Sequence, residues 1–134
     1  MVESELQPYG ERALLRGPEL MLEPKAALTL GLALHELATN TAKHGALSAL
    51  EGRVEVAWSV EHSPAHAAEL RLTWREHDGP PVRPPARRGF GSALVEQGLR
   101  HDLDGTAVME FRPDGLACEL TVPVAGALAA SQAT

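Results

Sequence analysis

The chain is poor in cysteine and in aromatic residues, and it has no long hydrophobic run. Its single cysteine, Cys118, permits no internal disulfide, and its neighbours are typical of a small residue in a strand. Two Trp, two Phe and one Tyr are present, so Leu, Val and Ala must fill the core. No apolar stretch reaches the roughly 18 residues of a membrane span, and no secretory signal opens the chain. We therefore expect a cytoplasmic protein without direct membrane contact.

Positive charge is also scarce. Twelve basic residues against eighteen acidic ones leave a net charge of −6, which argues against a general nucleic-acid-binding surface. The length of 134 residues is near the commonest size of a single domain. We expect an N-terminal segment at 1–15 that contributes an edge strand, one domain at 16–124 and an Ala-rich flexible tail at 125–134.

Hydrophobic periodicity predicts a long helix from Pro24 to about His44, with Gly45 as its stop. Alternating residues predict strands at 53–60, 70–76, 106–112 and 116–124, with a connection at 62–67 and a hairpin turn at 113–115. A shorter helix is predicted at 92–101. This order favours an α+β fold, a two-layer sandwich with helices on one face of a mostly antiparallel mixed sheet.

The long helix is predicted to carry a polar face. At 100° per residue, Glu36, Asn40 and Lys43 fall within an arc of roughly 60°. A carboxylate and an amide oxygen side by side suit a hard divalent cation that keeps waters and is shared with phosphates. An apolar stripe lies on another arc of the same helix: Leu30, Leu34, Leu37 and Thr41.

Glycines and arginines precede the second helix. Gly89-Phe90-Gly91-Ser92 allows close approach of backbone to a ligand, and a helix N-terminus offers free N–H groups to an anion. Taken alone, this pattern is more often a turn, with Ser92 as an ordinary N-cap. The preceding loop, 79–88, is stiffened by prolines, and its arginines suit either phosphate oxygens or solvent.

Two other segments carry acidic side chains. The segment Trp74-Arg75-Glu76-His77-Asp78-Gly79 ends a strand in acids and a glycine. A carboxylate there suits an exocyclic amine such as that of adenine, although, taken alone, the segment is more often a strand end closing on a plain Asp-Gly turn. His35-Glu36 begins like a zinc-protease helix, but Thr39 stands where the second histidine is needed. The sequence therefore favours no zinc site.

The order of these motifs resembles the Bergerat ATP-binding fold of histidine kinases, gyrase-type topoisomerases, mismatch-repair ATPases and heat-shock chaperones. It is most similar to the HWE family of bacterial sensor histidine kinases. That family is named for a His in the asparagine box, here His35 in His-Glu-Leu-Ala-Thr-Asn, and for Trp-x-Glu in the first glycine box, here Trp74-Arg75-Glu76. The resemblance runs from about Arg16 to Val124.

The resemblance implies a role for each matching residue. Asn40 is expected to ligate the Mg²⁺ that bridges the ATP phosphates, with Glu36 sharing the metal or orienting a water and Lys43 near a phosphate. Glu76 matches the acidic position that contacts adenine, and Asp78, where the family usually has Gly, is a rival for that contact. The rest of the implied nucleotide site consists of His35, His44, Gly79, Arg87, Arg88, Gly89, Phe90, Gly91 and Ser92.

The function implied is that of a catalytic domain that binds ATP and Mg²⁺ and donates the γ-phosphate to a histidine on a separate dimerisation domain. No long amphipathic helix pair precedes Pro24, so the phosphoacceptor is expected elsewhere, and the domain is expected to be poorly active and monomeric in isolation. The full-length kinase is expected to be a dimer that serves a response regulator receiver domain. The alternatives are a serine kinase of the anti-sigma-factor type and a non-catalytic docking module.

Overall fold

The computed structural model describes residues 7–43, 45–63, 66–80, 90–113 and 115–128. The helical elements are η1 (Gln7–Arg12), α2 (Pro24–Lys43), η2 (Ala46–Ser48), α4 (Phe90–Leu103) and α5 (Val124–Ala127). The strands are β1 (Ala13–Arg16), β2 (Arg53–Ser63), β3 (His66–His77), β4 (Thr106–Arg112) and β5 (Gly115–Pro123). Helix α2 therefore spans the range that the periodicity predicts.

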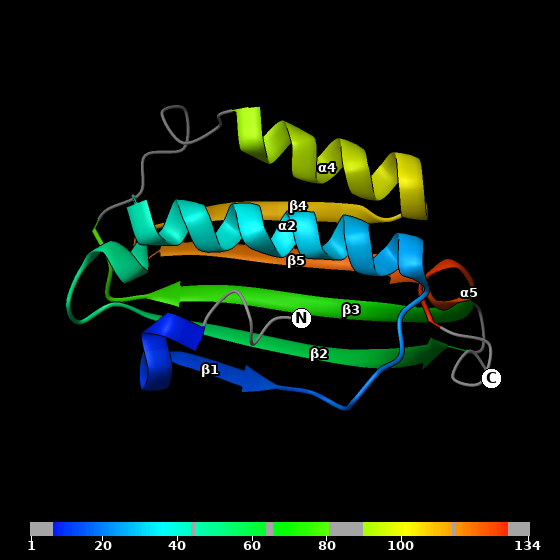
Figure 1. The fold of residues 1–134 in the computed structure, drawn as a ribbon, viewed down its shortest axis with the longest axis horizontal. Helices are drawn as coiled ribbons and strands as arrows, with labels where there is room; N and C mark the ends of the chain where they lie inside the picture. Colours follow the sequence, from blue (N-terminus) through cyan, green and yellow to red (C-terminus); the bar gives the residue numbers. More distant parts are fainter. Residues whose placement is uncertain (1–6, 44, 64–65, 81–89, 114, 129–134) are drawn as a thin grey trace.

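The strands form one five-stranded sheet in the order β1-β2-β3-β5-β4. Strand β1 is an edge strand parallel to β2, and the other pairs are antiparallel. Figure 1 shows α2 and α4 side by side over one face of this sheet. The predicted two-layer sandwich with a mostly antiparallel sheet is confirmed.

The core lies between the two layers. Val54, Val56 and Trp74 point from the sheet toward the helices and are at most 1% exposed. Helix α2 covers them with its leucine stripe, as expected for an amphipathic helix on a sheet. In the ranges that the structure describes, no helix is both long enough and apolar enough to cross a membrane.

The strand and helix boundaries differ most from the prediction at the β2–β3 hairpin and at α4. The connection expected at 62–67 is wrong, because β2 continues to Ser63 and β3 begins at His66. Ser63 pairs with His66, with a register shift between Glu61 and Ser63. The hairpin extends beyond the core at this end, so its residues no longer alternate between apolar and polar. Helix α4 also begins two residues earlier and ends two residues later than predicted.

The start of the Ala-rich segment is packed instead of frayed. Residues 124–127 form α5, and Leu128 is only 2% exposed and forms an isolated β-bridge with Leu22. Composition favoured a tail here because alanine-rich ends carry little apolar surface, but Val124 and Leu128 provide enough to anchor the turn. The remainder of the expected tail, 129–134, lies outside the described residues.

Candidate functional site

Helix α2 separates its two faces as the periodicity predicts. The buried face carries Leu30, Leu34 and Leu37, which are 1–4% exposed, together with a fully buried Thr41. On the other arc, the side chains of Glu36 and Asn40 are half-buried, and that of Lys43 is exposed. The carboxylate and the amide therefore lie at the protein surface, where a ligand can reach them.

The face of α2 that carries Thr29 is bonded to the end of α4. The two helices are antiparallel (Figure 1), and the hydroxyl of Thr29 donates a hydrogen bond of 3.1 Å to Oδ2 of Asp102. Asn40 lies eleven residues after Thr29, and Gly91 lies eleven residues before Asp102. Eleven residues are three helical turns, about 16 Å. Asn40 is therefore on the same face of α2 as Thr29, toward the end of the helical layer where α4 begins.

The end of α2 is closed by hydrogen bonds from the next few residues. The Gly45 N–H donates to the backbone carbonyls of Asn40 and Thr41, each at 3.1 Å. The buried hydroxyl of Thr41 accepts from the Leu47 N–H at 3.2 Å. The two Gly45 bonds satisfy carbonyls that the helix leaves free, and the Leu47 bond helps to turn the chain into η2. Gly45 is the stop that the sequence predicts.

Glu76 is buried at the end of β3, on the helical side of the sheet. It pairs with Val54 in the β2–β3 register, and its side chain is 4% exposed. Its Oε1 accepts from the Ala46 N–H at 2.9 Å, and its Oε2 accepts from the Trp74 indole N–H at 3.1 Å. A Cβ added to Gly45 would overlap Oε1. Glu76 therefore connects the strand end to the segment that follows α2.

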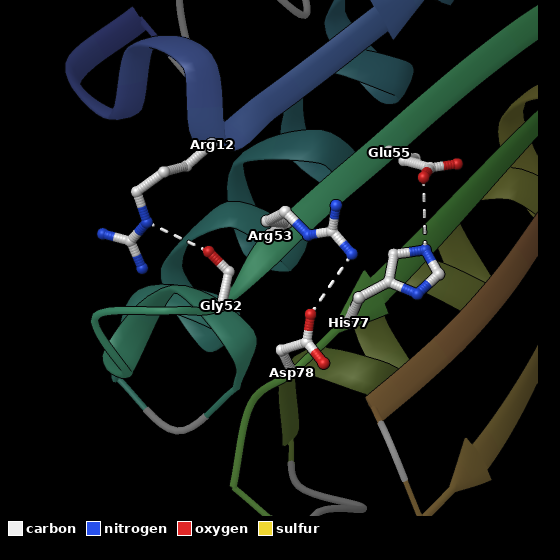
Figure 2. Close-up of polar contacts among 6 residues, drawn as sticks. All are labelled: Arg12, Gly52, Arg53, Glu55, His77 and Asp78. Atoms are coloured by element: carbon white, nitrogen blue, oxygen red, sulfur yellow. Dashed lines mark hydrogen bonds and ion pairs between the residues drawn. The ribbon is translucent and has the colours of Figure 1, made fainter.

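Asp78 lies on the other side of the sheet. Its backbone adopts a positive φ of 59°, which breaks the alternation of β3. Its carboxylate forms an exposed ion pair of 3.2 Å with Arg53, next to His77 and Glu55, which lie 3.5 Å apart (Figure 2). Arg53 and His77 are register partners, so they share the face opposite Glu76. Glu76 and Asp78, the two candidates for the adenine contact, thus have different surroundings.

Several predicted residues lie at the edge of, or outside, the described ranges. Phe90, Gly91 and Ser92 form the first turn of α4, and His35 is exposed on α2. Gly79 packs so closely on Ala46 that a Cβ there would overlap its backbone. The remaining predicted residues lie outside the residues described: His44, Arg87, Arg88 and Gly89.

The sequence did not indicate Ala46 or Arg12. Ala46 supplies the N–H that holds Glu76, and Arg12 donates to carbonyl oxygens of the segment 47–52. A backbone N–H is present at nearly every residue, so the sequence cannot single out that of Ala46. An arginine near a strand is expected to be an ordinary surface charge. The inward position of Glu76 could be predicted from the sequence, because Glu76 follows Trp74 by two residues in an alternating strand.

The buried thiol under this region is chemically inert. Cys118 pairs with Trp74 across β3 and β5, and burial, helped by nearby carboxylates, raises its pKa to about 12. A thiol with such a pKa stays protonated at neutral pH, and only the thiolate is a nucleophile. Cys118 is the small strand residue that the sequence predicts.

The donor set fits magnesium better than zinc. No group of three His, Cys, Asp or Glu side chains within the described ranges is arranged to hold a metal ion by itself. Glu36 and Asn40 offer two oxygen ligands, one turn apart and accessible. Mg²⁺ typically takes one or two protein oxygens and completes its shell with waters and phosphates. The α2 face fits a metal that arrives with a phosphate ligand.

Comparison with known proteins identifies the relatives of the chain. No family model matches it. A blue-light-activated histidine kinase 1 of Erythrobacter litoralis is 38% identical over 131 residues, which are 92% of this chain and 35% of that protein. A blue-light-activated histidine kinase of Brucella anthropi is 37% identical over 116 residues, 87% of this chain and 23% of that protein. The chain thus spans about a third or less of these relatives.

Solved structures agree on the fold. The histidine kinase domain of the Erythrobacter litoralis EL346 blue-light-activated histidine kinase superposes with a TM-score of 0.65 and 18% identity, covering 91% of this chain and 57% of that one. The catalytic domain of histidine kinase ThkA gives 0.66 and 12%, covering 91% and 86%. The chain has the fold of histidine kinase catalytic domains. Its sequence relatives are blue-light-activated histidine kinases, with which the HWE motifs are consistent.

Proposed function

We propose that the chain binds Mg-ATP between the polar face of α2, the first turn of α4 and the end of β3, and that it donates the γ-phosphate to a histidine of a separate dimerisation domain. The observation that supports this proposal is the antiparallel arrangement of α2 and α4, which are joined by the Thr29–Asp102 hydrogen bond. In this arrangement the oxygen-bearing face around Asn40 and the N-terminus of α4 lie at the same end of the helical layer, and a helix N-terminus is a favourable environment for phosphates.

For the adenine end, we favour Glu76 over Asp78. Glu76 faces the helical layer, on the side where α2 and α4 lie, whereas Asp78 is paired with Arg53 on the opposite face. Each carboxyl oxygen of Glu76 accepts one hydrogen bond from the protein. A carboxylate oxygen accepts two, so capacity is left for a hydrogen bond from an exocyclic amine.

For the phosphate end, Asn40 and Glu36 would hold Mg²⁺, and Lys43 would lie near a phosphate. The metal, when bound, would neutralise charge that builds up on the phosphate oxygens during transfer. Arg87, Arg88 and Gly89 are assigned to the phosphates by the family resemblance. The chain's own residues would position the nucleotide for transfer. Positioning, together with charge stabilisation, is the main source of catalysis in phosphoryl transfer.

The proposed reaction needs a second domain. The γ-phosphate would pass to a histidine nitrogen, with ADP as leaving group, and a response regulator receiver domain would take the phosphate from there. The relatives are about three to four times as long as the chain, so they have room for such a domain. We propose that the full kinase works as a dimer.

The test uses calorimetric titration of Mg-ATP into the chain. Asn40→Ala is expected to abolish Mg-dependent binding, because it removes a metal ligand, whereas Thr39→Ala, one position away on the same helix, is expected to bind normally. Equal affinity of the two variants would refute the metal assignment. Acid treatment of a candidate substrate that the chain has phosphorylated distinguishes a histidine kinase from a serine kinase. Phosphohistidine is lost in acid, and phosphoserine persists.

A further inference from the structure

Arg12 precedes α2 in the sequence, yet its side chain holds the segment that follows α2. It is the last residue of η1, directly before β1, and its side chain is half-buried. Its Nε donates to the Gly52 carbonyl at 3.0 Å (Figure 2), and its Nη2 donates to the carbonyls of Leu47, at 3.3 Å, and Ala49. One guanidinium thus spans three carbonyls, 35 to 40 residues away along the chain.

The same segment is held at its other end by Glu76. In the short turn 46–49, the Ala46 N–H donates to Glu76, and the Ala46 carbonyl accepts from the Ala49 N–H at 3.1 Å. The Ala49 carbonyl then accepts from Arg12. A continuous path of hydrogen bonds therefore leads from the guanidinium of Arg12, through one turn of backbone, to the carboxyl group of Glu76.

Close packing leaves this turn no room to shift alone. A Cβ added to Gly52 would overlap the Ala46 carbonyl, and one added to Gly79 would overlap the Ala46 backbone. The turn is therefore in van der Waals contact with the start of β2 and with the end of β3. Because interiors packed this closely transmit displacements, movement of the turn at the Arg12 end would move Ala46 and Glu76.

We propose that Arg12 is a positioning residue of the nucleotide site: it fixes the turn 46–49 and, through the Ala46 N–H, sets the orientation of Glu76 toward adenine. This inference rests on the proposed function, because it assigns Arg12 to the adenine end of that site. It also makes the segment 7–16 part of the nucleotide-binding machinery. Changes in how that segment is held would alter ATP affinity without contact with ATP.

The test compares Arg12→Ala with Arg16→Ala, an exposed arginine on β1 in the same segment. We expect Arg12→Ala to weaken Mg-ATP binding about tenfold, since three charge-assisted hydrogen bonds are lost, and Arg16→Ala to leave it within about twofold. Hydrogen exchange at the Ala46 and Leu47 amides is expected to accelerate in Arg12→Ala only. Arg12→Lys retains the charge but not the planar fork, so it is expected to behave like Arg12→Ala.

A second nucleotide distinguishes a role of Arg12 in the adenine contact from a role in the stability of the whole site. Purine riboside triphosphate lacks the exocyclic amine, so the unsubstituted chain is expected to bind it more weakly than ATP, and Arg12→Ala is expected to add no further loss. An equal loss for both nucleotides, or affinity for ATP like that of Arg16→Ala, would overturn the inference while the proposed function stands. Failure of the unsubstituted chain to bind Mg-ATP would overturn the proposed function and this inference together. If Arg12→Ala unfolds, Arg12→Lys is judged by the same criteria.

Discussion

The two ends of α2 have different surroundings. Its first half, around Ala26 and Leu30, packs into the apolar core near α4 and α5. Its C-terminal end meets hydrogen-bonding groups from segments distant in sequence: Gly45, the buried Thr41 hydroxyl and the turn held by Glu76 and Arg12. Apolar burial is non-directional, whereas hydrogen bonds fix direction. One end of the helix therefore stabilises the fold, and the other would orient the proposed nucleotide site.

The largest expected effect tests the apolar end. Leu30→Ala is expected to lower the free energy of unfolding by about 2–5 kcal/mol, because it removes buried methyl groups and leaves a cavity. Leu28→Ala is the control, since Leu28 is 66% exposed on the same helix. Urea denaturation measures both, and Mg-ATP affinity of the folded Leu30→Ala variant is expected to be nearly unchanged. A large loss of affinity would erase the distinction between the two ends.

Glu76→Ala tests the polar end. It leaves the Ala46 N–H and the Trp74 indole N–H without their acceptor in a buried region, at a cost of about 1–3 kcal/mol for each donor. It is also expected to weaken Mg-ATP binding, unlike Leu30→Ala. The matched control is Glu55→Ala on the outer face of β2. Calorimetric titration and urea denaturation report the two effects, and unchanged ATP affinity would contradict the adenine assignment.

The pH dependence of the free energy of unfolding tests the burial of Cys118 in the apolar layer beneath Glu76. Its pKa is raised in the folded state to about 12, above the ordinary value of 9.0, so the buried thiol stabilises the fold below pH 9. That contribution is lost as pH rises from 9 toward 12, by about 1.4 kcal/mol at pH 10. Urea denaturation at pH 8 and pH 10 should show a shallower decline for Cys118→Ala. Parallel declines would contradict a buried thiol.

The smallest effect is expected from the exposed pair of Arg53 and Asp78. Their side chains are 52% and 60% exposed, and such surface pairs contribute about 0–1 kcal/mol. Asp78→Asn is therefore expected to change neither the unfolding midpoint nor ATP affinity by a measurable amount. A marked loss of ATP affinity would move the adenine contact from Glu76 to Asp78, and it would also contradict the division between the two faces of the sheet.

Local pattern predicted much of this molecule. The 3.6-residue period placed Leu34 and Leu37 in the core and Asn40 at the surface, and alternation placed Trp74 inside. The pattern failed where strands leave the core, so the β2–β3 hairpin was predicted too short, and where a few apolar residues anchor an Ala-rich segment. Strand parity also implied that Glu76 points inward, but not that the positive φ of Asp78 turns its side chain to the other face.

By itself, the sequence determined the identity of the elements and which face of each is apolar, because both follow from spacing between near neighbours. The tertiary structure decided which groups meet. The Ala46 N–H and Glu76 are 30 residues apart, and Arg12 and the Gly52 carbonyl are 40 apart. Every residue has a backbone carbonyl, and every residue except proline has a backbone N–H. The pattern of residue types therefore cannot predict which of these groups become partners. Only packing the turn 46–49 between β2 and β3 selects them.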